Sequence, residues 1–124
     1  MATQMGFAYS QTIKGVGAFG SSFYFCAEED EKNIGSQCIN TKFKDLEHIT
    51  QNIEYLEDNG YIDKTGNLST SKVFLFNGRE DTEIPVGMGK LSELVWKKYT
   101  QNIKSNFSID SEHNMVTDFY GWKC

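Results

Sequence analysis

The spacing of hydrophobic and polar positions predicts three helices. The clearest covers about residues 42–59, where apolar residues recur every three or four positions and charged residues occupy the opposite side. Asn59-Gly60 ends it, because glycine accepts the left-handed conformation found after helices. A second helix is expected from residue 1 to about 11, and Pro85 opens a third. The expected apolar faces are Ala2, Met5, Ala8 and Tyr9 in the first helix, Phe43, Leu46, Ile49, Ile53 and Leu56 in the clearest one, and Met88, Leu91, Leu94, Val95 and Tyr99 in the last.

Three strands are predicted between these helices, over residues 13–19, 73–76 and 103–109. Four consecutive large apolar residues, Val73-Phe74-Leu75-Phe76, indicate a strand buried on both faces, as in parallel sheets. Alternating helices and strands predict a parallel sheet with right-handed crossovers. We therefore expect one α/β domain over residues 1–124, with about three parallel strands and flanking helices, a small sheet for this class.

Composition and charge exclude several classes of function. The chain is 39% hydrophobic and 23% charged, which is typical of a globular protein. Its net charge is −5 and its basic residues are scattered, so we expect no nucleic-acid partner. No apolar run approaches the roughly 18 residues of a membrane span, and the first residues lack the basic head and apolar block of a signal peptide.

The three cysteines, Cys26, Cys38 and Cys124, leave two interpretations open. In an oxidising compartment Cys26 and Cys38 would form a disulfide that closes a short acidic loop. In the cytosol all three would be free buried thiols. The spacings fit no zinc motif, and His48, beside the apolar face of the helix at residues 42–59, is expected to be structural or solvent-facing, so no metal or cofactor is predicted.

Candidate chemistry follows the second and third strands. Asp81 lies just beyond the strand at 73–76, and His113 follows the strand at 103–109. An acid and then a histidine, each after a strand, match the last two members of a Ser…Asp…His hydrolase order. No G-x-S-x-G nucleophile motif is present, and Ser21-Ser22 lacks a strand-to-helix elbow. Alternatively, Asp81-Thr82 is only a turn before Pro85 and His113 an ordinary loop residue.

Five segments, in order along nearly the whole chain, resemble the poly(3-hydroxybutyrate) depolymerase family of α/β-hydrolase esterases. Two lie near the start, in residues 8–15 and 23–27, and a third is Gly-Tyr-Ile-Asp at 60–63 with Asn-Leu at 67–68. The fourth, residues 73–82, is similar to the family's strand and acid loop, V-x-L-F-x-G-x-x-D-T. The fifth, HNMVTDFYGWKC at 113–124, is similar to its histidine loop, H-x-M-P-T-D-x-Y-G-x-x-C.

This resemblance implies a partial α/β-hydrolase fold with Asp81 as the triad acid and His113 as the base. It places the nucleophilic serine a few residues before Met1, in agreement with a first helix that has no capping residue. It also implies a secreted enzyme acting on an ester or polyester, and a Cys124 that pairs outside this sequence. Val116 in place of proline and Gly20-Ser21-Ser22 in place of Gly-Gly-Pro depart from the family pattern.

Without its serine, such a chain is expected to be inactive alone. The alternative is a non-catalytic binding module derived from the same fold, with an apolar surface for a polymer or a protein. Core and rim packing is the competing explanation for the aromatic residues of that surface. They are Tyr24, Phe25, Phe119, Tyr120 and Trp122. In either case, unpaired sheet edges predict self-association.

Overall fold

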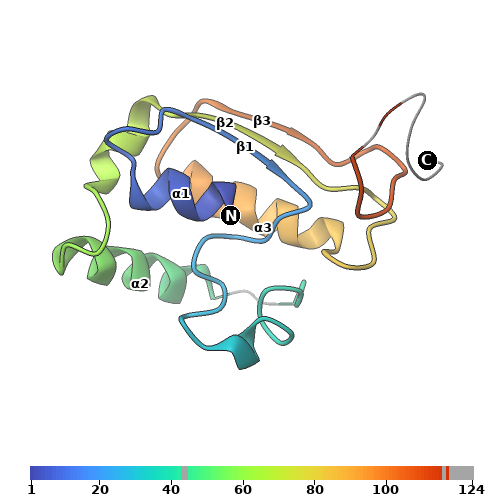
Figure 1. The fold of residues 1–124 in the computed structure, drawn as a ribbon, viewed down its shortest axis with the longest axis horizontal. Helices are drawn as coiled ribbons and strands as arrows, with labels where there is room; N and C mark the ends of the chain where they lie inside the picture. Colours follow the sequence, from blue (N-terminus) through green and yellow to red (C-terminus); the bar gives the residue numbers. More distant parts are fainter. Residues whose placement is uncertain (43–44, 116, 118–124) are drawn as a thin grey trace.

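Among the described residues, three α-helices and three strands alternate along the chain, as predicted. A computed structural model describes residues 1–42, 45–115 and 117. Figure 1 shows the elements in order. They are α1 (Ala2–Ala8), β1 (Gly15–Phe19), the 3₁₀ helix η1 (Glu31–Asn33), α2 (Leu46–Asp58), the 3₁₀ helix η2 (Thr65–Thr70), β2 (Lys72–Phe76), α3 (Val86–Lys97) and β3 (Ile103–Asn106). Most are a few residues shorter than the periodicity predicted.

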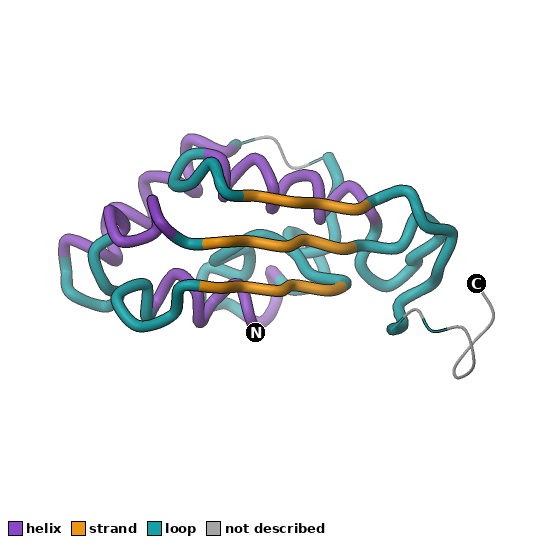
Figure 2. The backbone as a smooth tube through the Cα atoms, turned by 90° about the horizontal axis from the view of Figure 1, so that it is seen from above, coloured by secondary structure: helices purple, strands orange, loops and turns teal. Residues whose placement is uncertain are grey.

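The strands form one parallel sheet in the order β1-β2-β3. Val73 of β2 lies opposite Val16 of β1 and Ile103 of β3. Figures 1 and 2 show the three α-helices on the same side of this sheet, with its other face uncovered by any described element. The predicted parallel α/β architecture is confirmed.

The prediction that β2 is buried on both faces is wrong. Val73 and Leu75 point into the core and are 4% and 1% exposed, whereas Phe74 between them is 39% exposed. The reason is that described helices cover only the face to which Val73 and Leu75 belong. Phe74 instead contacts Phe19 of β1 on the outer face, with ring centroids 5.8 Å apart.

The buried face of α1 also differs from the predicted one. Thr3, Gly6 and Phe7 are buried, whereas Met5 and Tyr9 are exposed. Gly6 allows the close approach, because a Cβ there would lie 2.5 Å from Cγ2 of Val16. Close packing of a small residue against the sheet therefore outweighed the spacing of the larger apolar ones.

The apolar faces of α2 and α3 are largely as predicted. In α2 the described residues Ile49, Ile53 and Leu56 are buried, and Leu46 packs against the core; Phe43 lies outside the described residues. In α3 the expected Leu94 is 46% exposed, and Trp96 is fully buried instead. Trp96 contacts Phe7 of α1 at 4.4 Å between ring centroids, which joins the two helices in one core.

Cys26 and Cys38 form a disulfide, with an S–S distance of 1.98 Å. It closes the acidic loop that contains η1, as the oxidised interpretation predicts. Cys124 lies outside the described residues. Among the described residues, no helix is long and apolar enough to cross a membrane, and no group of histidine, cysteine and acidic side chains is arranged to hold a metal ion.

Candidate active site

The loops that follow the three strands meet at one edge of the sheet. Gly20 directly follows β1, Asn77 directly follows β2, and the chain reaches His113 a few residues after β3. Because the sheet is parallel, all three loops leave it from the same edge, where ligands bind in open α/β folds.

Asp81 is held in one orientation by the loop in which it lies. Its side chain is only 1% exposed. Oδ1 accepts hydrogen bonds from the backbone amides of Glu83 at 3.0 Å and Ile84 at 2.7 Å. Its other oxygen, Oδ2, is 2.9 Å from Nδ1 of His113. The backbone therefore fixes one carboxylate oxygen and leaves the other for the histidine.

His113 is the exposed member of this pair. Its side chain is 45% exposed, and its ring contacts Asp81 only through Nδ1. An ionised carboxylate can only accept hydrogen bonds, so when Asp81 is ionised and the imidazole is neutral, Nδ1 is the donor and Nε2 carries the free lone pair. Among the described residues, none hydrogen-bonds to Nε2. This arrangement makes Nε2 available to take a proton from a third group.

The acid loop and the histidine loop are joined along their backbones. The amide of Arg79 donates to the carbonyl of Ile109 at 2.8 Å, and the Arg79 guanidinium pairs with Asp110. Gly78 lies so close to Ser111 that a Cβ at this position would overlap the Ser111 carbonyl oxygen. These contacts fix the distance between the two loops that carry Asp81 and His113.

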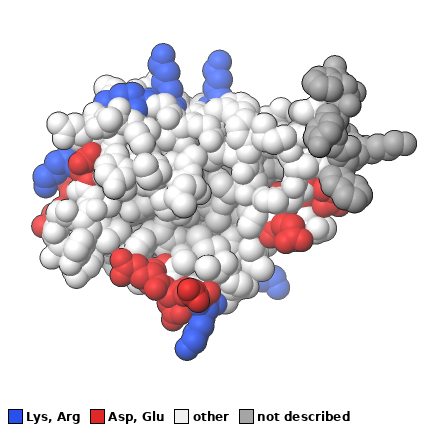
Figure 3. Space-filling model, in the orientation of Figure 1, with Lys and Arg blue, Asp and Glu red and all other residues white. Residues whose placement is uncertain are grey.

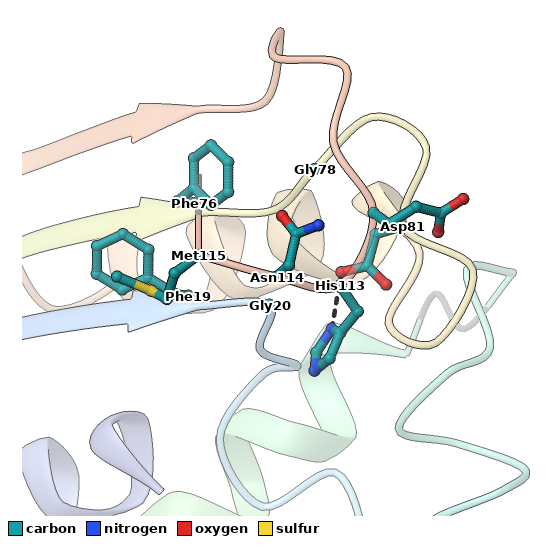
Figure 4. Close-up of a pocket in the computed structure, with 9 residues that line it drawn as sticks. Phe19, Gly20, Phe76, Gly78, Asp81, His113, Asn114 and Met115 are labelled. Atoms are coloured by element: carbon teal, nitrogen blue, oxygen red, sulfur yellow. Dashed lines mark hydrogen bonds and ion pairs between the residues drawn. The ribbon is translucent and has the colours of Figure 1, made fainter. Parts of the chain in front are cut away.

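A cavity of about 300 Å³ lies beside the pair. Figure 4 shows Phe19, Phe76 and Met115 together on one side of this cavity, with the hydrogen-bonded Asp81 and His113 on the other. The complete lining consists of Phe19, Gly20, Phe76, Gly78, Asp81, Glu112, His113, Asn114 and Met115. An apolar wall facing a proton acceptor is suited to an apolar substrate with one reactive polar group.

Sequence reasoning selected Asp81 and His113 but missed the residues that place them. Gly20 and Gly78 approach neighbouring backbones and rings, which no local pattern reveals. Asn77 is buried, and its Nδ2 donates to the carbonyl of Ser21 at 3.4 Å and to that of Ile84 at 3.3 Å, tying the β1 and acid loops together. The available signal for Asn77 was its position directly after the apolar run of β2.

The other predicted residues lie away from this site or outside the described residues. His48 is half exposed, and its Nε2 lies 2.9 Å from Oε1 of Glu28, which fits the structural role expected of it. Tyr24 is 5% exposed and stacks on Phe7 at 4.4 Å, so it belongs to the core. Phe25 is partly buried against the same core. The remaining aromatic residues of the expected binding surface, Phe119, Tyr120 and Trp122, lie outside the described residues.

Between β1 and η1, where every residue is described, the chain has no nucleophile elbow. Ser21 and Ser22 lie in a loop, and the next helical segment is η1, which begins at Glu31. A nucleophilic serine of an α/β-hydrolase stands instead on a sharp turn between a strand and a helix. In the structure, as expected from the sequence, neither Ser21 nor Ser22 lies on such a turn.

Comparisons with known proteins extend over the whole chain. It is 30% identical over 128 residues to a poly(3-hydroxybutyrate) depolymerase of Delftia acidovorans, covering 100% of this chain and 26% of that protein. No family model matches. The structure superposes on the PHB depolymerase of Penicillium funiculosum with a TM-score of 0.79 at 23% identity, covering 94% of this chain and 36% of that one.

A second solved structure, a serine-to-alanine PHB depolymerase in complex with an R3HB trimer, gives a TM-score of 0.82 at 24% identity, over 98% of this chain and 38% of that one. The chain thus spans about a quarter of the curated relative and little more than a third of each solved structure. The resemblance predicted from the sequence is confirmed: over its whole length the chain is similar to one part of the poly(3-hydroxybutyrate) depolymerases, and it has the α/β-hydrolase architecture of that part.

Proposed function

We propose that this chain supplies the acid and the base of a carboxylic ester hydrolase. The observation that carries the proposal is the 2.9 Å contact between Oδ2 of Asp81 and Nδ1 of His113, at the rim of a cavity. Asp81 holds the imidazole in the tautomer with its proton on Nδ1. Nε2 then takes the proton of an attacking hydroxyl group and later returns it to the alcohol that leaves the ester.

The proposed substrate is an ester or polyester of short hydroxy acids. The chain's similarity to proteins named for poly(3-hydroxybutyrate) supports this class, as does the trimer bound in one solved structure. The apolar side of the cavity, formed by Phe19, Phe76 and Met115, supports this class independently. A short alkyl group of the substrate could pack against these side chains, because it needs no hydrogen-bond partner.

In this proposal the nucleophilic hydroxyl comes from polypeptide that this sequence does not include. The missing G-x-S-x-G motif and the loop geometry of Ser21 and Ser22 support this. The nucleophile would need to lie about 3 Å from Nε2 of His113. Loss of the serine alone costs roughly a millionfold in kcat in a triad hydrolase. The chain by itself is therefore expected to be inactive.

The test is an assay of the purified chain on a short-chain nitrophenyl ester. We expect the wild-type chain to hydrolyse the ester no faster than the His113→Ala variant and no faster than buffer alone. The control variant is Tyr61→Ala, a change at an exposed position outside the cavity lining, and it should give the same rate. Turnover by the wild-type chain that disappears in His113→Ala would show that the chain carries its own nucleophile, which contradicts this part of the proposal.

Secretion and self-association are also part of the proposed biology. The Cys26–Cys38 disulfide supports an oxidising, extracellular location, because such bonds persist there. The exposed edge strands and the uncovered outer face of the sheet support association with further polypeptide.

A further inference from the structure

Gly20 lies against both members of the Asp81–His113 pair. It directly follows β1, and its amide donates a hydrogen bond to the carbonyl of Phe76 at 2.7 Å, so its backbone is tied to β2. A Cβ built on Gly20 would lie 2.6 Å from Cε1 and 2.8 Å from Nδ1 of His113. It would also lie 3.5 Å from Oδ2 of Asp81.

We propose that Gly20 is a positioning residue, whose bare α-carbon gives the His113 ring the space in which Nδ1 reaches Asp81. The inference rests on the proposed function, since it assigns the residue that orients the base. Contacts under 3 Å from a Cβ to ring atoms are too short to persist, so a side chain at Gly20 displaces the ring.

Asp81 cannot follow a displaced ring. Its side chain is 1% exposed, and its Oδ1 is held by the amides of Glu83 and Ile84. His113 is 45% exposed and has open space on its other side. The strain of a side chain at Gly20 is therefore relieved by moving the imidazole outward, which breaks the contact with Asp81.

Gly60 provides a matched control. Gly20 has a φ of +52° and Gly60 one of +73°, so alanine at either position carries the cost of a left-handed backbone. A Cβ on Gly60 would meet nothing within 4 Å, whereas one on Gly20 meets His113. Gly20→Ala and Gly60→Ala therefore carry the same kind of backbone strain, and only Gly20→Ala also brings a Cβ into the His113 ring.

The experiment is nitrogen-15 NMR of imidazole-labelled protein, at a pH where the rings are neutral. The chain has only two histidines, and the His48→Gln variant assigns their signals. In wild type and in Gly60→Ala we expect His113 to be mainly the Nδ1–H tautomer, with a downfield Nδ1 proton. In Gly20→Ala we expect that proton signal to disappear and the Nε2–H tautomer to dominate.

Retention of the downfield proton in folded Gly20→Ala would overturn the inference, as would its loss in both Gly20→Ala and Gly60→Ala. If Gly20→Ala does not fold, Gly20→Asn and Gly60→Asn repeat the comparison, because asparagine tolerates a positive φ better. If Gly20→Asn fails to fold while Gly60→Asn folds, Gly20 is required for folding itself and not specifically for placing His113, which would contradict the proposal. The readout is the geometry of the pair, so it can succeed or fail independently of any ester hydrolysis.

Discussion

The two members of the Asp81–His113 pair are held to very different degrees. Asp81 has its Oδ1 fixed by two backbone amides and is almost fully buried. His113 has one polar contact among the described residues and is half exposed. This asymmetry suits acid–base chemistry, because the orienting carboxylate should stay in place while the base reaches its reaction partner.

A second residue-scale feature is Tyr99, whose hydroxyl is buried without a hydrogen-bond partner among the described residues. Burial raises the pKa of Tyr99 to about 12, with smaller contributions from the charges of Glu54 and Glu57. In the unfolded chain the pKa is about 10. Above that pH the unfolded state loses the Tyr99 proton before the folded state does, so the free energy of unfolding falls as the pH rises.

We therefore expect wild type to lose about 1 kcal/mol more stability than Tyr99→Phe between pH 9 and pH 11, because one pKa unit corresponds to ~1.4 kcal/mol. Urea unfolding at the two pH values measures this difference. Phenylalanine keeps the edge contact with Phe7, whose ring centroid is 5.3 Å away, and removes only the titrating group. Equal losses in the two proteins would show that Tyr99 ionises as readily in the folded state as in the unfolded one.

At the scale of elements, the sequence predicts the order and type of structure better than the direction of each side chain. The faces of α2 and the positions of β2 and β3 follow from periodicity and apolar runs. The face of α1 does not, because Gly6 against Val16 sets how the helix packs. The exposure of Phe74 does not either, since it depends on which layers are present rather than on the local sequence.

The candidate site divides in the same way. Asp81 and His113 are recognisable for two reasons. Each follows the carboxyl end of a strand, where ligands bind in open α/β sheets, and the segments that contain them resemble those of the poly(3-hydroxybutyrate) depolymerase family. Gly78 stands at the glycine of the family's acid-loop pattern and Asn77 directly follows the apolar run, but the roles of Gly20, Asn77 and Gly78 are not recognisable. Each acts through a neighbour 30 or more positions away in sequence. Long-range contacts of this kind leave no spacing or composition signal.

The disulfide is the element-scale feature whose removal has the clearest expected effect. The bond spans 12 positions in the sequence. Closing a loop of this length stabilises the folded state by about 3 kcal/mol in the chain-entropy model. We expect the Cys26→Ala/Cys38→Ala variant to lose roughly that much in the free energy of unfolding, measured in urea without reductant.

Reduction of wild type should give a similar loss, and reductant should not change the double variant further. The loop lies away from the cavity lining, so the His113 tautomer should remain as in wild type. A fully stable double variant would show that the hydrophobic core around the loop suffices without the bond.

At the scale of the whole molecule, the main feature is the outer face of the sheet, which no described element covers. Phe19 is 48% exposed and Phe74 39%, and these two rings contact each other there. Lys72 and Lys104 flank them on the same face. Figure 3 shows several basic side chains projecting on the sheet side of the molecule, whereas acidic side chains lie mainly along the helical side and at the two ends. Adjacent aromatic residues on an open face favour association.

We expect the chain to self-associate through this face. Sedimentation velocity over a concentration series should show a species larger than the monomer, and Phe74→Ser should shift the equilibrium toward monomer. The control is Tyr61→Ser, which removes an aromatic ring that is 68% exposed away from the sheet. An equal effect of the two variants, or a wild-type chain that is monomeric throughout, would contradict a specific role for the outer face.

In the proposed function, Asp81 and His113 are the acid and base of an ester hydrolase whose nucleophile lies elsewhere. The most direct measurement replaces the matching segment of the Delftia acidovorans relative with this chain and follows hydrolysis of a short-chain ester. We predict a folded, active chimera whose kcat falls about 10⁴-fold in Asp81→Asn and about 10⁶-fold in His113→Ala. A folded chimera whose rate is unchanged by either substitution would contradict the account.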